Sequence, residues 1–422
     1  MKKLLSIALA ALTTSMFLGS CSAGNQDSAG PSSGSQSSSE IENENIKRLD
    51  MESLAKNIDE IAQYDLAQNK VFGAAYYVYQ DGVEFEKCYG TTSLNGDTAV
   101  SNTSIFRLAS MTKPVTAIAA LKLVETGLLD LDDPVDKYIP SFKNIKIITS
   151  FGPAVAVAPT TMPTIRHILT HTAGIGGDET KLATMTASDK QTLDASIAFY
   201  VRVGLDFEPG TKQQYSGSGS FDVLTKIIEI VSGTDYLTFL QEHVFAPCGM
   251  TDTTFTPNAE QEKRMVDMHN RKDGVSTTHS MPQGCIFDNF PSTHYLGGAG
   301  LVSTLSDYGK FAKMLLNKGA TENGRILNES TFKQLCTAQV DYEIMPQAAR
   351  WGLGVRVITE ATYPNLPVGS FGWSGAYGTH FWIDPENKIF AVYMKNSMVD
   401  GGAGNESAVN FEKAVYSSFV VE

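Results

Sequence analysis

The spacing of a serine and a lysine is the first feature of this sequence that could perform chemistry. Residues three apart lie on one face of a helix, and an amine buried beside a hydroxyl can take its proton and make it nucleophilic. The Ser-x-x-Lys pattern occurs at Ser53/Lys56, Ser110/Lys113 and Ser330/Lys333. The first and third pairs lie in polar, amphipathic stretches, where a serine that caps a helix is the ordinary explanation.

The second pair stands in a different setting. It lies in the segment FRLASMTKPV and precedes a mostly apolar stretch at 115–125. Because proline is tolerated in the first turn of a helix, Pro114 predicts a helix that begins between Ser110 and Lys113. Free N–H groups at that helix end favour a developing negative charge. We expect Ser110 to be the nucleophile and Lys113 its base; the alternative is a capping serine beside an exposed lysine.

Two other kinds of site are poorly supported. The nucleophile elbow Gly-x-Ser-x-Gly is absent, and the nearest segment is Gly372-Trp373-Ser374-Gly375-Ala376. The closest histidines, His167 and His171, lack the glutamate of a zinc-binding His-Glu-x-x-His helix. Cysteines occur at positions 21, 88, 248, 285 and 336. They form no Cys-x-x-Cys pair, and those after position 21 are expected to be buried apolar residues, so we expect no metal and no other cofactor.

The elements that position these residues are predicted from periodicity. Helical spacing of apolar residues predicts a helix over 41–69, and a last helix over 406–419. Two hairpins are predicted, one around Asp81-Gly82 and one around the turn 384–387. Their strands are 71–80, 83–89, 380–383 and 388–395. Strands and helices at both ends of the chain predict an antiparallel sheet covered by terminal helices.

The middle of the chain has a different pattern. Helical periodicity dominates from about 160 to 250, at 165–170, 195–203, 221–231 and 236–245. We interpret this stretch as a helical region inserted between the halves of a sheet domain. The predicted boundaries are 46–150 and 295–422 for the α/β half and 151–294 for the helical half.

Several segments together resemble a known superfamily. They are FRLASMTKPVTAIAALKLVETGLLDLDDPVDKYIP (106–140), TIRHILTHTAGI (164–175), FEPGTKQQYSGSG (207–219), GGAGLVSTLSDYGKFAKMLLNKG (297–319) and FGWSGAYGTHFWIDP (371–385). Over residues 50–422 the chain resembles the serine β-lactamase and penicillin-binding protein superfamily, in the branch of class C β-lactamases, D-Ala-D-Ala carboxypeptidases and β-lactamase-like esterases. The resemblance implies an α+β fold of the β-lactamase/transpeptidase type, with an antiparallel sheet, flanking terminal helices and an inserted helical subdomain.

The resemblance also implies a second catalytic element. Tyr215-Ser216-Gly217 is similar to the family's Tyr-x-Asn at its first two positions. By this similarity Tyr215 would contact Ser110 and Lys113 and pass a proton to the leaving group; the alternative is a tyrosine that only packs in the core. Gly217 lacks the amide that would hold a substrate's acylamino carbonyl. His171, in the THTAG turn, belongs to the scaffold in this family pattern.

The third element departs from the β-lactamase pattern. Trp373-Ser374-Gly375 stands where β-lactamases have Lys-Thr-Gly, so the lysine that would receive a substrate carboxylate is missing. Ala376 would supply a backbone N–H that pairs with that of Ser110 as an oxyanion hole. Tryptophan here is found among the superfamily's esterases, and an indole suits an apolar acyl or alcohol group. We expect Trp373, Ser374 and Gly375 to contact the substrate. For Trp373, the alternative is a side chain that only packs inside the protein.

Composition and the first residues indicate the compartment. The chain has 33 Lys and Arg residues and 46 Asp and Glu residues, a net charge of −13. Binding the phosphate backbone needs clustered positive charge, so we expect no nucleic-acid partner. Residues 1–20 and Cys21 resemble a bacterial lipoprotein signal; the alternative is an ordinary secretory signal. The Ser- and Gly-rich residues 21–45 are expected to be a flexible linker. We expect an extracytoplasmic protein anchored to the bacterial cell membrane through two acyl chains on Cys21.

These expectations combine into one hypothesis with alternatives. The preferred function is a membrane-tethered serine hydrolase that forms an acyl-enzyme, with small carboxylic esters as substrates. A D-Ala-D-Ala carboxypeptidase, a D-aminopeptidase or a weak β-lactamase acting on D-amino-acid peptides or β-lactams uses the same residues, as does a transacylase. From another class, a non-catalytic lipoprotein that binds a ligand remains open.

Overall fold

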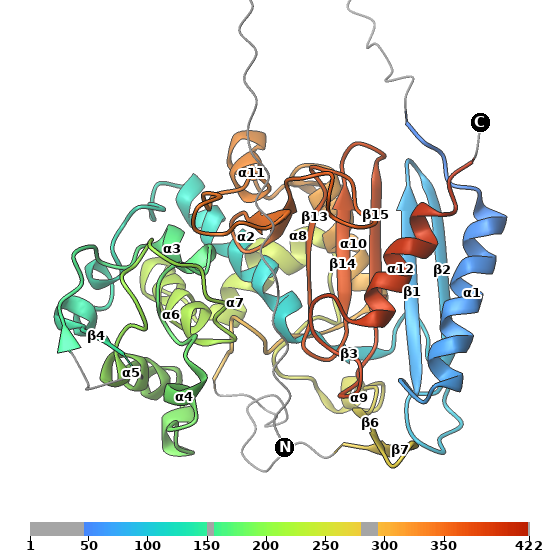
Figure 1. The fold of residues 1–422 in the computed structure, drawn as a ribbon, viewed down its shortest axis with the longest axis horizontal. Helices are drawn as coiled ribbons and strands as arrows, with labels where there is room; N and C mark the ends of the chain where they lie inside the picture. Colours follow the sequence, from blue (N-terminus) through green and yellow to red (C-terminus); the bar gives the residue numbers. More distant parts are fainter. Residues whose placement is uncertain (1–45, 150–155, 280–293, 421–422) are drawn as a thin grey trace, which may run out of the picture. The chain divides into compact units, whose positions relative to one another are not determined.

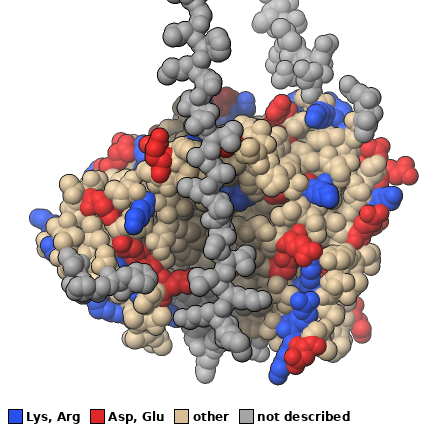
Figure 2. Space-filling view, viewed as in Figure 1, with Lys and Arg blue, Asp and Glu red and all other residues tan. Residues whose placement is uncertain are grey.

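The computed structural model describes residues 46–149, 156–279 and 294–420, and these belong to one compact unit that begins at Asn45. The predicted signal peptide, Cys21 and the whole of the predicted linker lie outside the described residues. Within the described residues, no helix is both long and apolar enough to cross a lipid bilayer. Acidic and basic side chains are interspersed over the face in Figure 2.

A seven-stranded antiparallel sheet forms one half of the unit (Figure 1), in the order β11-β12-β13-β14-β15-β1-β2. Its strands are β1 (Gly73–Gln80), β2 (Val83–Gly90), β11 (Ala349–Trp351), β12 (Arg356–Ile358), β13 (Phe371–Ser374), β14 (His380–Asp384) and β15 (Ile389–Met394). Both predicted hairpins are present, since β1 pairs with β2 and β14 with β15. The first and last strands of the chain are neighbours within the sheet, where β1 pairs with β15.

The terminal helices cover one face of this sheet. Helices α1 (Met51–Ala67) and α12 (Glu406–Tyr416) lie side by side there, and α10 (Leu305–Leu316) packs on the opposite face (Figure 1). Alternation along β1 explains the two faces: Ala74, Tyr76 and Val78 belong to the apolar cluster beneath the terminal helices, whereas Ala75 and Tyr77 belong to the main core. The predicted fold is confirmed.

The ends of the terminal helices differ from the prediction. The side chain of Asp50 accepts a hydrogen bond from the backbone N–H of Ser53 at 2.7 Å, so α1 begins at Met51. Before it, Leu49 forms a β-bridge with Phe419. Residues 46–50 are therefore not helical, and α12 ends at Tyr416 rather than 419, because the chain turns extended on both sides to make this pairing.

Helices dominate the other half. Its longer helices are α2 (Thr112–Glu125), α5 (Leu193–Val203) and α6 (Gly219–Ser232). The shorter ones are α3 (Ile165–Leu169), α4 (Glu179–Leu182), α7 (Tyr236–Leu240), α8 (Ala246–Cys248), α9 (Ala259–Glu262) and α11 (Glu329–Leu335), with a π-helical turn at Gln241–Phe245. Nearly every residue of α2 is buried, as expected of a helix that is apolar on all sides. It packs against α6, and both contribute to the main core.

Small strand pairs complete the fold. They are β3 (Ile105–Arg107) with β8 (Val302–Thr304), β4 (Ile147–Ile148) with β5 (Ala156–Val157), β6 (His269–Lys272) with β7 (Val275–Thr278), and β9 (Ala320–Thr321) with β10 (Gly324–Arg325). The β3–β8 pair holds the segment that leads to Ser110 against the segment before α10. This strand pair therefore fixes the position of the segment that carries the predicted nucleophile.

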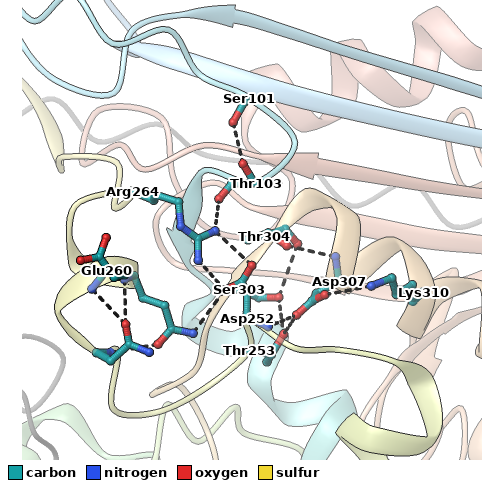
Figure 3. Close-up of polar contacts among 12 residues, drawn as sticks. Ser101, Thr103, Asp252, Thr253, Glu260, Arg264, Ser303, Thr304, Asp307 and Lys310 are labelled. Atoms are coloured by element: carbon teal, nitrogen blue, oxygen red, sulfur yellow. Dashed lines mark hydrogen bonds and ion pairs between the residues drawn. The ribbon is translucent and has the colours of Figure 1, made fainter.

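A polar cluster stabilises the surroundings of the β3–β8 pair (Figure 3). Arg264 donates to Asp252 Oδ2 at 3.0 Å and to the carbonyl of Thr103 at 2.8 Å. Asp307, at the start of α10, accepts from the backbone N–H of Asp252 at 2.7 Å and from the hydroxyl of Thr253 at 3.0 Å. We call these residues, together with Ser303, Thr304 and Lys310, the Asp307 cluster; its hydrogen bonds tie the loop before α9 to β8 and α10.

Candidate active site

Ser110 lies on a sharp turn that leads into α2. It is the middle residue of a 3₁₀ turn, Ala109–Met111, and α2 starts at Thr112. Ala109, just before it, has a φ of 46°, a left-handed conformation that costs a residue other than glycine roughly 1 kcal/mol or more. This turn places Ser110 just before the N-terminus of α2, where the residue is 9% exposed.

Lys113 is completely buried beside Ser110. Its Nζ donates to Ser110 Oγ at 3.3 Å and to the carbonyls of Gly217 at 2.6 Å and Gly298 at 2.8 Å. All three acceptors are neutral oxygens, and among the described residues no carboxylate forms an ion pair with this amine. The structure therefore places the predicted amine within contact of the predicted hydroxyl, and Gly217 takes part through its carbonyl rather than a side chain.

Tyr215 packs against the same lysine. The Lys113 Nζ lies 4.9 Å from the centre of the Tyr215 ring, and Trp351 and Trp373 flank the ring with centroids at 6.0 and 5.4 Å. The Tyr215 hydroxyl accepts a hydrogen bond from Trp373 Nε1 at 3.2 Å. Within the described residues no hydrogen bond joins this hydroxyl to Ser110 or Lys113. Tyr215 is thus at the site, with its oxygen held by the third motif.

Two buried titratable groups lie behind this cluster. His171 Nδ1 accepts from the backbone N–H of Ser216 at 3.2 Å, and burial lowers the pKa of His171 well below its usual value. Its ring lies 4.5 Å from that of Tyr215, so this histidine supports the tyrosine as a neutral side chain. Burial raises the pKa of Asp222, on α6, to about 8, although the hydroxyl of Tyr200 and the charge of Lys113 act in the opposite direction.

The third motif lies at the end of β13, beside the nucleophile turn. Thr379 Oγ1 donates to the carbonyl of Leu108 at 3.0 Å, which ties the turn between β13 and β14 to the residues just before Ser110. A Cβ at Gly375 would lie 2.3 Å from that carbonyl oxygen, so this close approach requires glycine. Ala376 follows and lines the same pocket as Ser110. The pair of backbone N–H groups predicted for the oxyanion hole is on adjoining segments.

The Ser374 hydroxyl has a partner within the protein. Its Oγ lies 2.7 Å from Nδ1 of His380, directly across on β14. Sequence reasoning expected Ser374 to contact substrate, and the residue does line the pocket. The histidine contact is an additional constraint on its hydroxyl that the motif alone does not reveal.

These residues surround a pocket of about 340 Å³ whose wall includes Ser110, Tyr215, Trp351, Arg356, Trp373 and Ser374. Arg356 is the one charged side chain among the described residues that line it. Its guanidinium donates to the hydroxyl of Tyr363 at 2.7 Å and lies 5.6 Å from the Trp373 ring centre. The wall is thus aromatic with one cation at its side.

Sequence reasoning missed several of these residues. Trp351 and Arg356 lie in a stretch without a catalytic motif, and no role was predicted for Gly298, His380 or Arg356. A signal existed for Gly298, since the segment GGAG (297–300) is part of the superfamily resemblance. For the metal prediction, the described residues contain no group of three or more His, Cys, Asp or Glu side chains arranged to hold an ion.

Residues 55–412 match the sequence profile of the Beta-lactamase family. The chain belongs to this family. The predicted superfamily is therefore confirmed, and the matched range includes Ser110, Lys113 and Tyr215.

Known relatives within this family differ in what they do. The chain is 26% identical to esterase EstB of Burkholderia gladioli, over 87% of this chain and 97% of the relative. It is also 26% identical to a putative D-alanyl-D-alanine carboxypeptidase of Salmonella heidelberg, over 76% of each chain. A solved structure with the same fold is EstCE1, a hydrolase with promiscuous acyltransferase activity, at a TM-score of 0.74 and 23% identity over 86% of this chain and 99% of that one.

Proposed function

We propose that this member of the beta-lactamase family hydrolyses small carboxylic esters through an acyl-enzyme on Ser110. Lys113 takes the Ser110 proton as the hydroxyl attacks the ester carbonyl, and the backbone N–H groups of Ser110 and Ala376 stabilise the oxyanion. Tyr215 passes a proton to the departing alcohol and takes the proton that Lys113 received, so both groups return to their starting forms. The acyl group then remains on Ser110 until water releases it.

The contact between Lys113 Nζ and Ser110 Oγ carries this proposal. In its neutral form the amine can donate to the Gly217 and Gly298 carbonyls and keep its lone pair for the proton of the Ser110 hydroxyl. Trp373 supports esters over β-lactams, because it puts an indole where a β-lactamase has a carboxylate-binding lysine, and Trp351 extends the same aromatic wall. Similarity to EstB is in keeping with this preference.

The test compares two substrate classes on one preparation. Wild-type protein and Ser110→Ala are assayed with p-nitrophenyl butyrate and with a chromogenic cephalosporin. We expect ester turnover that Ser110→Ala reduces at least about 10³-fold. Efficient cephalosporin turnover with negligible ester hydrolysis would reject the ester proposal, and an unchanged Ser110→Ala variant would reject the nucleophile.

A D-amino-acid peptidase is the second candidate, favoured by Arg356. Its guanidinium is a cation in the pocket wall, and such a group suits the C-terminal carboxylate of a D-Ala peptide. This candidate predicts covalent labelling of Ser110 by fluorescent penicillin and release of D-Ala from a D-Ala-D-Ala peptide. Absence of both at high concentration eliminates it.

We further propose that the protein is anchored outside the cytoplasmic membrane through Cys21. The support is the short apolar run that ends at this cysteine and the Ser- and Gly-rich residues that follow. In a bacterial host fed radiolabelled palmitate, the full chain should incorporate label and Cys21→Ala should not. Label on both proteins, or on neither, contradicts a lipid anchor at Cys21.

A further inference from the structure

A second hydrogen-bonded chain of a serine, a histidine and a carboxylate lies next to the pocket. Ser374 Oγ is 2.7 Å from His380 Nδ1, and His380 Nε2 is 3.1 Å from Glu412 Oε1. The side chains of His380 and Glu412 are only 2% and 3% exposed. The three residues come from β13, β14 and α12, so a chain of polar atoms runs from the terminal helix through the sheet to the pocket wall.

The order of partners sets the direction of each hydrogen bond. A glutamate carboxylate only accepts, so the imidazole donates its Nε2–H to Glu412 and leaves Nδ1 as an acceptor. The Ser374 hydroxyl then donates its proton to Nδ1. This is the arrangement of base and orienting acid that activates hydroxyl groups in serine hydrolases. The Ser374 oxygen keeps its lone pairs for a donor in the pocket.

Charged and aromatic side chains from several elements surround His380. Glu412 faces it from α12, Trp382 packs beside it at a centroid distance of 5.4 Å, and Tyr393 lies opposite on β15. From β12, Arg356 borders the same small cavity as His380. One negative side chain therefore contacts the imidazole, and one positive side chain lines a small cavity beside it.

We propose that Ser374, His380 and Glu412 form a relay that receives the proton of the water that hydrolyses the acyl-enzyme. This inference rests on the proposed acyl-enzyme function. The water oxygen bonds to the acyl carbon, its proton passes to Ser374 Oγ, and the Ser374 proton passes to His380 Nδ1. When the tetrahedral adduct collapses, the bond from the acyl carbon to Ser110 breaks, and the imidazolium proton returns through Ser374 Oγ to the Ser110 oxygen, which becomes a hydroxyl again.

The roles of the three residues differ. Ser374 is the group that contacts the water, and it lines the pocket that holds Ser110. His380 and Glu412 act through Ser374 as positioning residues. Lys113 and Tyr215 remain the proton carriers of acylation, so the two half-reactions would use different sets of side chains. Loss of the relay must therefore slow deacylation and leave acylation intact.

The experiment measures the two half-reactions separately. The burst of p-nitrophenol from p-nitrophenyl butyrate reports acylation, and decay of the butyryl-enzyme, followed by intact mass after removal of substrate, reports deacylation. In Glu412→Gln an amide oxygen still accepts from His380 but the charge is lost. We expect its deacylation rate to fall about tenfold or more while the burst rate stays within twofold; Ser374→Ala should behave likewise.

Tyr416→Phe is the matched control. The Tyr416 hydroxyl donates to Asp384 Oδ2 at 2.8 Å and joins the same two elements, α12 and β14, away from the pocket. It should alter neither rate. Equal loss of both rates in Glu412→Gln and Ser374→Ala, or unchanged decay in both, overturns the relay. A wild-type protein that forms no acyl-enzyme overturns instead the proposed function.

Discussion

The active site and the Asp307 cluster satisfy their charged side chains in opposite ways, although both lie against the β3–β8 pair. In the cluster Arg264 pairs with Asp252, and Lys310 Nζ lies 3.3 Å from Asp307 Oδ1 (Figure 3). In the site Lys113 contacts two carbonyls and one hydroxyl. In the cluster each cation therefore has a carboxylate partner, whereas the amine at the site has only neutral oxygens as partners. Paired charges stabilise the fold, and the amine without an ion-pair partner is the group that we propose as the base.

The largest expected effect comes from the two lysines. Lys113→Met removes the proton acceptor and should lower kcat/KM for p-nitrophenyl butyrate about 10³-fold, within the range of a general base. Lys310→Met, at the Asp307 cluster, should retain activity within about twofold. Steady-state kinetics on both variants, with circular dichroism to check folding, measures this. Similar losses in the two variants would remove the distinction between the regions.

Asp307→Asn should show the reverse pattern. The amide keeps the size of the side chain but loses the charge that Lys310 and Thr253 contact. Because Asp307 is buried, we expect the free energy of unfolding to fall by about 2 kcal/mol. Urea denaturation gives this value, and kcat of the folded protein should be unchanged. A large drop in kcat at full stability would make the cluster part of the active site.

The pH dependence of stability tests the comparison between the two regions through Asp222, a buried carboxyl group near Lys113. Burial raises its pKa to about 8 in the folded protein, against about 4 in an unfolded chain. The native state therefore keeps a proton that the unfolded state loses, and the free energy of unfolding falls as pH rises from about 4 to about 8. This neutral carboxyl also leaves Lys113 without a negative partner.

The measurement is the melting temperature at pH 5 and pH 8.5. Asp222→Asn lacks the titrating carboxyl, so its melting temperature relative to wild type should rise with pH. A difference between the two proteins that does not vary with pH would mean that Asp222 is ionised at neutral pH. Lys113 would then have a charged neighbour like the lysine of the Asp307 cluster.

The smallest expected effect concerns Arg356, a second cation without an ion-pair partner among the described residues. Its replacement by methionine should reduce kcat/KM for p-nitrophenyl hemisuccinate about threefold to fivefold relative to the neutral butyrate ester, the size of a partly exposed charge pair. Arg350→Met is the control, since Arg350 is bonded to Thr359 and is not part of the pocket wall. An equal change for both esters would show that Arg356 does not sense substrate charge.

Local spacing explains how much could be predicted. Ser110 and Lys113 are three residues apart, so the proximity of their side chains follows from helix geometry once Pro114 indicates where the helix starts. The two hairpins follow equally from short turns and alternating residues. The predicted helix over 41–69 was wrong at its N-terminal end, since α1 begins only at Met51. Asp50 caps α1, and Leu49 pairs with Phe419, a contact between opposite ends of the chain.

The amino-acid sequence by itself determined the contact between Ser110 and Lys113, the pairs of neighbouring strands and the family. Each of these depends on residues close together in the chain or on several motifs in a fixed order. Only the tertiary structure decided that Arg356 reaches the pocket, that Trp373 holds the Tyr215 hydroxyl and that Ser374 meets His380 and Glu412. Those contacts join β12, β13, β14 and α12. Their residues are far apart in the sequence, so the spacing within any one segment cannot predict that their side chains come into contact.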